Sequence, residues 1–455
     1  MRFCCDDRAK NLLGASISMG LVVMAAAPAT VVQNIALAES TDIDLMAGYY
    51  SEVARLSMSI IAAVLFHPVY QVIGIKFTAL ISTFLVTGSY WPMIWIVNKY
   101  VVYLGAAISG VGTGIMWVLW PKVVIDNSDE GKAQKNMTYW WVALSMGYMI
   151  GGLCNYFYFH GVTKISAANR VMVYAICVGI TTLASLIAAF GVTDIKEDQK
   201  RHRPLKEEDT LTYTTVCQGE DTTKEEEVGV KVLMATKAED DTITKGFREA
   251  LEWFNVMKRR PEFWLLFVPL VYWGFIWGYF IKIVPTAVAS ISDKRNLIPL
   301  MAVINGASFL VGSSTWTFIT KMTNNTFCIL LASTMHLGAL TLSILTFPKG
   351  AASEIMELGL TETYIKPDSI YIVVIAGLIG LADSGISIIF YTAAGRVYGE
   401  GTSFGFSLNC IGFCIFYICA MFAPSLFDLH SYCYSMGALV CVMCGALTIG
   451  LRKFI

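Results

Sequence analysis

The amino-acid sequence predicts an all-α membrane protein with twelve transmembrane helices arranged as two six-helix bundles. The 455-residue chain contains twelve apolar stretches, is 56% hydrophobic and only 15% charged, and has one strongly charged segment that divides the stretches six and six. A helix rises about 1.5 Å per residue, so roughly 20 apolar residues cover a hydrocarbon core of about 30 Å. This composition excludes an ordinary soluble domain.

The predicted helices follow one another with short polar gaps. Their bounds are residues 11–34, 46–68, 72–97, 100–124, 137–160, 171–192, 263–284, 296–319, 326–347, 370–391, 403–424 and 431–452. Helices are expected because only they satisfy every backbone hydrogen bond of a single segment within lipid. The first stretch follows a basic leader and exceeds the apolar core of about 7–15 residues of a cleaved signal peptide, so we expect it to be retained.

The middle of the chain, residues 193–261, shows the one clear shift in composition. It contains the runs KEDQKRHRPLKEEDT and KEEEV, and such charge density predicts a solvated linker. The predicted organisation is therefore an N-terminal bundle over residues 1–192, this linker, and a C-terminal bundle over residues 262–455.

The end of the linker alternates apolar and charged residues at helical spacing. Phe247, Leu251 and Phe254 would share one face of such a helix. The pattern predicts either an amphipathic helix on the inner membrane surface or a solvated continuation of the seventh transmembrane helix.

The distribution of basic residues predicts the orientation. With both termini in the cytoplasm, more of the 33 Lys and Arg residues lie in inner segments than in outer ones. The sequons at Asn136 and Asn324 then face the cytoplasm, so we expect neither to be glycosylated. The net charge of −1 gives no support for a nucleic-acid partner.

Four stretches carry a family resemblance. The seventh helix reads LLFVPLVYWGFIWGYFIKIVPTAVAS and the tenth GLIGLADSGISIIFYTAAGRVYG, while VVQNIALAES ends the first and GVGTGIMWVLWPKVVIDNS ends the fourth. The matching residues are Gln33, Asn34, Gly110, Gly112, Gly114, Trp117, Asn127, Ser128, Pro269, Gly274, Phe280, Pro285, Gly380, Asp383 and Gly395. These motifs resemble the Unc-ninety-three-like family, an ion-channel regulatory branch of the major facilitator superfamily.

The resemblance implies a fold and a set of cavity residues. In that superfamily the two bundles rock around a central space lined by helices one, four, seven and ten. It would therefore place Gln33, Asn34, Trp117, Trp277 and Asp383 around one cavity.

Four ionisable side chains within the apolar stretches are the best candidates for a functional site, because charge is costly there and marks a partner or a wet cavity. Glu52 and Arg55 are three residues apart, so they share a helix face and are expected to form an ion pair, either structural or functional. Lys282 lies near the outer end of the seventh helix, and its long side chain would either reach the headgroups or face the cavity.

Asp383 lies well inside the tenth helix and has no basic neighbour within one turn. It therefore needs a partner from another helix. Two roles are open for it: a proton acceptor that couples a transport cycle, or a hydrogen-bonding contact between helices.

Several motifs do not indicate chemistry. Gly110, Gly112 and Gly114 follow no strand, so they predict close helix contact and not a phosphate-binding loop. Ser403 stands in a GTSFG sequence at the head of a membrane helix, also without a strand, so we expect no nucleophilic serine and no enzyme activity.

The histidines and cysteines give no metal-ligand spacing, so we expect neither a metal site nor a cofactor. Cys441 and Cys444 lie within the last helix, where cysteine acts as a small apolar residue. Cys4 and Cys5 lie beside basic residues just before the first helix and are candidates for palmitoylation.

Three functions remain open from the sequence. The resemblance implies an accessory subunit that regulates a potassium channel, most simply at the plasma membrane, with an endomembrane location as the alternative. The fold equally allows a transporter of a small solute, and the wider family implies a trafficking chaperone for membrane receptors. The predicted cavity holds few polar side chains, which favours the accessory subunit over the transporter.

Overall fold

The computed structural model describes most of the chain as membrane-length helices. The described residues are 7–38, 47–95, 98–129, 131–159, 166–193, 258–289, 297–351, 363–398, 402–423 and 426–454, with 248–249, 251–252, 254–255 and 291 between them. Cys4, Cys5 and most of the predicted linker lie outside them, as does the side chain of Asn34.

The first half of the chain forms one group of helices. These are α1 (Asp7–Ala38), α2 (Ala47–Leu85), the 3₁₀ turn η1 (Val86–Ser89), α3 (Trp91–Trp95), α4 (Lys99–Asp126), α5 (Ala133–Phe159) and α6 (Ala167–Gly191). Asn98 and Ser166 cap α4 and α6 by accepting hydrogen bonds from backbone N–H groups in the first turn.

The helix α2 contains two crossings. At Gly74 the backbone leaves the helical region, with φ 72° and ψ 174°, a left-handed conformation that glycine adopts without a Cβ penalty. The chain turns back there, because Arg55 of the first arm and Ser82 of the second arm both contact the middle of α4, at Gly110 and Gly112. Single membrane helices on either side of residue 70 were predicted, and the two arms of α2 correspond to them.

The second half forms another group. It comprises α11 (Pro261–Gly278), the π-helical turn η2 (Tyr279–Ile283), α12 (Val284–Ala289), α13 (Leu297–Met322), α14 (Asn325–Thr346), α15 (Ser369–Tyr398), α16 (Thr402–Phe422) and α17 (Leu429–Phe454). Pro261 begins α11, where its missing N–H costs nothing, and Asn324 caps α14.

The number of crossings agrees with the prediction. Ten helical segments of the described residues are long and apolar enough to span a membrane, and one of them, Ala47–Trp95, contains the two arms of α2. Counting both arms and adding α5, which packs between α1 and α13, gives twelve. The fold is the predicted all-α membrane architecture.

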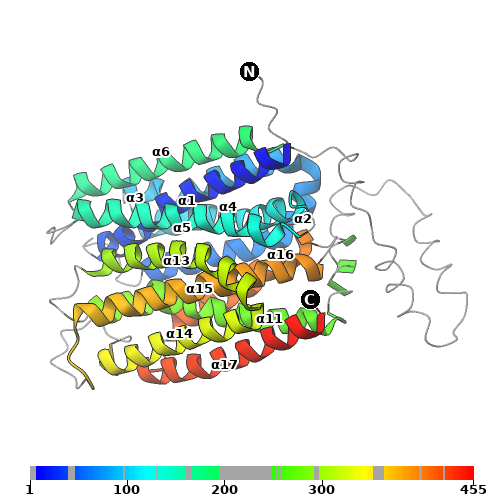
Figure 1. The fold of residues 1–455 in the computed structure, drawn as a ribbon. Helices are drawn as coiled ribbons and strands as arrows, with labels where there is room; N and C mark the ends of the chain where they lie inside the picture. Colours follow the sequence, from blue (N-terminus) through cyan, green and yellow to red (C-terminus); the bar gives the residue numbers. More distant parts are fainter. Residues whose placement is uncertain are drawn as a thin grey trace, which may run out of the picture.

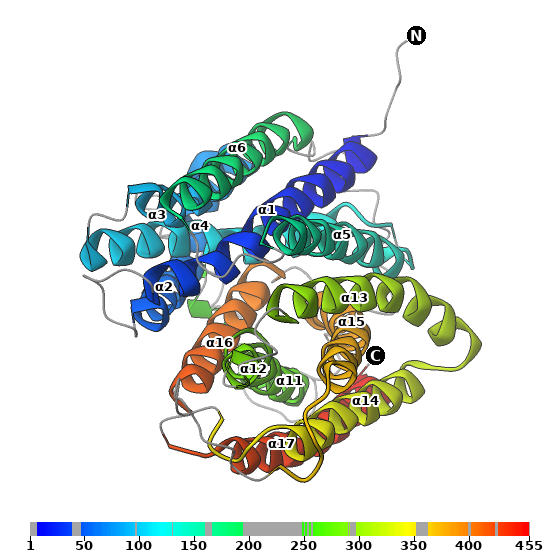
Figure 2. The ribbon, with the colours of Figure 1, turned by 90° about the vertical axis from the view of Figure 1, so that its left-hand side faces the viewer.

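The two groups lie against each other along two lines of contact. Figure 2 shows α5 beside α13 and α2 beside α16, and α4 and α15 also contact the opposite group. In Figure 1 the start of α1, the end of α6, the start of α11 and the end of α17 lie at the same end of the helices. We call this end the linker side. The exact boundaries predicted for the bundles and the linker remain a prediction.

Small residues allow α4 to pack tightly between the two arms of α2. A Cβ at Gly110 would collide with the carbonyl oxygen of Arg55, and one at Gly114 with that of Ser59. The Ser59 hydroxyl fills the contact by donating to the Gly110 carbonyl oxygen at 2.9 Å. The glycine run therefore serves helix packing, as small residues do in membrane proteins.

Candidate functional site

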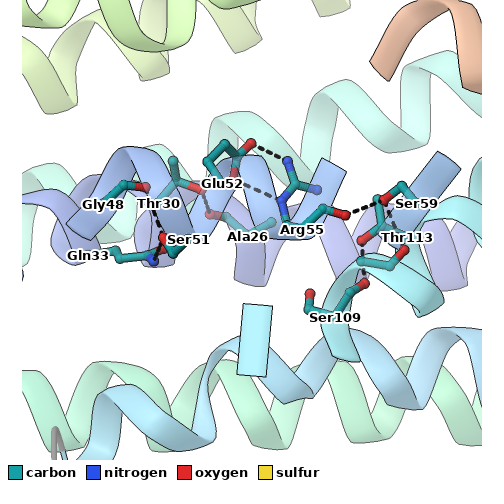
Figure 3. A network of polar contacts seen from close by, with 11 residues as sticks. Ala26, Thr30, Gln33, Gly48, Ser51, Glu52, Arg55, Ser59, Ser109 and Thr113 are labelled. Carbon is teal, nitrogen blue, oxygen red and sulfur yellow. Dashed lines mark hydrogen bonds and ion pairs between the residues drawn. The ribbon is translucent and has the colours of Figure 1, made fainter. Parts of the chain in front are cut away.

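A charged pair lies in the first arm of α2, on the side of the membrane opposite the linker. Figure 3 shows the Arg55 guanidinium binding the Glu52 carboxylate through both oxygens, with Nε donating to Oε2 at 2.9 Å and Nη2 contacting Oε1. Helical spacing of three residues puts the two side chains on one face. A bidentate pair of this kind keeps both charges satisfied within an apolar span.

The C-terminal half contributes to the surroundings of this pair. Lys282 is buried in the π-helical turn η2, with Nζ 5.7 Å from the ring centroid of Tyr49, and its charge acts on Glu52. Tyr417 of α16 lies beside the same carboxylate. Since Lys282 is only 5% exposed, its side chain faces the protein rather than the headgroups. Lys282 lies within η2, a π-helical turn that adds one residue to the helix.

Two neutral contacts join the same region. Tyr49 and Thr286 bring their hydroxyls within 3.3 Å of each other across the two halves. Gln33 of α1 donates from Nε2 to the Ser51 hydroxyl at 2.8 Å, one residue before Glu52 (Figure 3). Gln33, Glu52, Arg55 and Lys282 therefore belong to one region, which we call the outer polar cluster.

Aromatic rings from both halves meet between the two groups of helices. Trp141 of α5 is fully buried, and its ring centroid lies 6.0 Å from that of Trp273, 5.3 Å from that of Phe309 and 5.7 Å from that of Tyr391. Other members extend this contact, and we call the whole set the central aromatic cluster: Trp117, Trp140, Trp141, Trp273, Trp277, Phe309, Tyr391 and Phe413.

The cavity candidates Trp117 and Trp277 occupy opposite edges of this cluster. Trp117 packs on Trp140 and Trp141, and Trp277 contacts Phe413. Indole and phenol rings meet here at tilted and edge-to-face angles, which are favourable for aromatic pairs. The halves meet here through ring contacts.

Asp383 lies elsewhere, inside the C-terminal group. Its Oδ1 is 3.1 Å from Nε2 of His336 on α14, and both side chains are buried. The ring of Tyr272 on α11 lies 5.3 Å from the His336 ring. The sequence predicted that Asp383 needs a partner from another helix, and His336 is that neighbour.

The linker side carries a third polar group. His67 of α2 places Nδ1 3.2 Å from the Ser403 hydroxyl at the head of α16 and Nε2 3.1 Å from Oε2 of Glu249. Gln71, one turn further along α2, donates to the same carboxylate oxygen at 2.7 Å. The Ser403 hydroxyl therefore takes part in a contact between α16 and α2.

One face of α16 connects the linker side with the outer polar cluster. Ser403 meets His67, Cys410 Sγ lies 3.9 Å from the Gly114 carbonyl oxygen, and Tyr417 meets Glu52. The intervals of seven residues bring these side chains onto one helical face. We call the line of contacts between α16 and helices α2 and α4 the seam.

Several residues that contact the predicted site residues could not be predicted from the sequence. His67, His336, Trp141 and Tyr417 are ordinary residues in apolar helices, and only the packing of distant helices makes them partners. The one available signal was that His67 and His336 are polar residues at predicted membrane depth. Among the described residues, no three metal-ligating side chains come together.

Comparison with known families decides the classification. Residues 39–448 match the family described as ion channel regulatory protein UNC-93. The chain belongs to this family. The match begins after α1 and covers the other helices of both groups, and the predicted resemblance to an ion-channel regulatory family is confirmed.

Solved structures agree on the fold. This UNC-93 family protein superposes on the proton:xylose symporter XylE, a major facilitator superfamily protein bound to 6-bromo-6-deoxy-D-glucose, with a TM-score of 0.65. The match covers 98% of this chain and 96% of the symporter at 11% sequence identity. At that identity the likeness establishes the fold alone. No curated protein matches the chain.

Proposed function

We propose that this UNC-93 family protein is an accessory subunit that regulates a potassium channel in the plasma membrane, with both termini and the linker in the cytoplasm. The family supports a regulatory role, and the resemblance of the helix motifs to channel regulators supports a potassium channel as the partner. The positions of the chain ends on one side of the helices support a common side for the termini (Figure 1).

The central aromatic cluster is the observation that favours a regulator over a transporter. A transporter of polar solutes needs a hydrated path with convergent polar groups between its halves. Here Trp140 and Trp141 are fully buried and contact rings of the opposite half. This arrangement favours a stable connection between the halves, which suits a subunit that works through its outer surface.

Co-expression tests the proposal. Two-pore potassium channels are expressed in oocytes with and without this protein, and both whole-cell current and surface channel density are recorded. We expect the current per surface channel to change by at least severalfold and the two proteins to co-purify. A change in surface density alone would instead identify a trafficking chaperone, and no change in either quantity would refute the proposal.

Transport of a small solute is the second candidate, and the outer polar cluster favours it. Charged side chains that lie between the halves in the membrane are typical of transporters that couple movement to ions. Proteoliposomes that contain only this protein and a pH-sensitive dye test it. Solute-dependent proton entry that disappears in Glu52→Gln would establish transport.

A further inference from the structure

The segment before α11 contacts both halves of the protein on the linker side. Glu249 lies against α2, where its Oε2 is 3.1 Å from His67 Nε2 and accepts a hydrogen bond from Gln71. Five residues later the ring of Phe254 meets the ring of Phe404, on the first turn of α16, at 6.4 Å and 72°. A short stretch of chain therefore reaches across the seam from one half to the other.

A direct contact between α2 and α16 lies next to this segment. His67 uses both ring nitrogens, one toward the Ser403 hydroxyl of α16 and the other toward the Glu249 carboxylate. The carboxylate at Nε2 and the hydroxyl at Nδ1 engage both ring nitrogens, and the Gln71 amide nitrogen also lies 3.1 Å from Nε2. Glu249 thereby orients the imidazole for its contact with α16.

The other end of the seam lies at the outer polar cluster. Tyr417 of α16 is an electrostatic neighbour of Glu52 of α2, and Cys410 lies between the two ends, against the Gly114 carbonyl. Opening of the linker side along this seam requires that the contacts at His67, Ser403 and Phe404 separate. The segment before α11 is positioned to prevent this. Elsewhere on that side the halves also meet at the Thr138 and Thr317 hydroxyls, 2.8 Å apart, and where Ile125 packs beside Gly395.

We propose that the described residues before α11, 248–249, 251–252 and 254–255, act as a strap that fastens α2 to α16 across the linker side of the seam, through Glu249 on His67 and Gln71 and through Phe254 on Phe404. Release of the strap lets the linker ends of the two halves part while the outer polar cluster stays closed. This inference is independent of whether the protein regulates a channel or transports a solute, because it concerns only which contacts hold the two halves together.

Cross-linking tests the position of the strap in the full-length protein. A protease site is inserted in the linker at residue 220, and Gln71→Cys is combined with Glu249→Cys. After oxidation and cleavage, we expect the two fragments to migrate as one full-length band under non-reducing conditions. The pair Gln71→Cys and Glu252→Cys is the matched control, since Glu252 is exposed and lies one turn away. Equal cross-linking of the two pairs, or none, would overturn the proposal.

Alkylation of a native cysteine tests the mechanical role. Cys410 is 7% exposed and lies about 10 Å into the seam from Ser403, at 1.5 Å of helix rise per residue. In Glu249→Ala and in Phe254→Ala we expect N-ethylmaleimide to modify Cys410 about tenfold faster, which corresponds to about 1.4 kcal/mol. Peptide mass spectrometry gives the rate, and Glu252→Ala should match the wild type.

An internal control separates strap release from unfolding. Cys177 and Cys328 are buried within single groups of helices, away from the seam. Release of the strap should leave both unmodified while Cys410 reacts. If Cys177 and Cys328 react together with Cys410 in both variants, or if the Cys410 rate is unchanged in both, the segment is no strap.

Discussion

Single residues in this membrane protein gain their roles from partners on distant helices. The pairing of Glu52 with Arg55 was predictable, because both lie on one helix at a spacing of three residues. The pairing of Asp383 with His336 was not, because α14 and α15 are brought together only by the packing of the whole C-terminal group. Sequence periodicity therefore gives local pairs and leaves partners from other helices open.

Removal of the His336 imidazole should destabilise the protein strongly. His336→Ala leaves the buried Asp383 carboxylate beside a void, and breaking a buried pair in this way costs about 3–5 kcal/mol. We expect a clear drop in the thermal unfolding midpoint in detergent, followed with a thiol-reactive dye. The double variant Asp383→Asn, His336→Gln should lose much less, because no carboxylate is then left buried beside a void. Equal losses in both variants would contradict the pairing.

The outer polar cluster should respond to charge removal in a similar way. Glu52→Gln leaves Arg55 and Lys282 as neighbouring cations without their shared carboxylate. Loss of a buried counter-charge costs several kcal/mol, so we expect a lower unfolding midpoint. Arg55→Gln combined with Glu52→Gln should restore part of it. An unchanged midpoint in Glu52→Gln alone would show that the pair contributes nothing to stability.

At the scale of helices, the sequence predicted most of the architecture. Membrane-length apolar runs set the helices, since lipid leaves the backbone no other partners. The two arms of α2 follow from the same rule, but their continuity across Gly74 could not be predicted, because the turn depends on one left-handed residue. The end of the linker was left open between a membrane-surface helix and a solvated one, and both remain predictions; among its described residues, Glu249 contacts α2 and Phe254 contacts α16.

Helix contact through Gly110 gives a prediction for α4. A methyl group at this position would press on the Arg55 carbonyl of α2, so Gly110→Ala must separate the two helices and weaken the N-terminal group. We expect a lower unfolding midpoint. Gly179→Ala on α6 is the control, because a Cβ there meets nothing within 4 Å and alanine favours helix by up to about 1 kcal/mol. A drop of the same size in both variants would refute the packing argument.

The whole molecule is two groups of helices held by the contact of α5 with α13, the seam and the central aromatic cluster. The sequence predicted the division into halves from the charged linker, but not the cluster, because its rings come from α4, α5, α11, α13, α15 and α16 and meet only in the fold. Trp141 alone contacts three rings of the opposite half. The stability of the assembled molecule should therefore depend heavily on this one side chain.

Expression of the two halves as separate chains, divided at residue 220, tests this dependence. We expect the halves to assemble and co-purify, because the α5–α13 contact and the seam consist of contacts that do not require a continuous linker. Trp141→Ala removes three ring contacts worth about 0.5–1.5 kcal/mol each, so recovery of the partner half should fall more than tenfold. Phe157→Ala, on the same helix but 72% exposed, should leave recovery unchanged. Similar recovery with Trp141→Ala and Phe157→Ala would mean that the halves are held together elsewhere than at the central aromatic cluster.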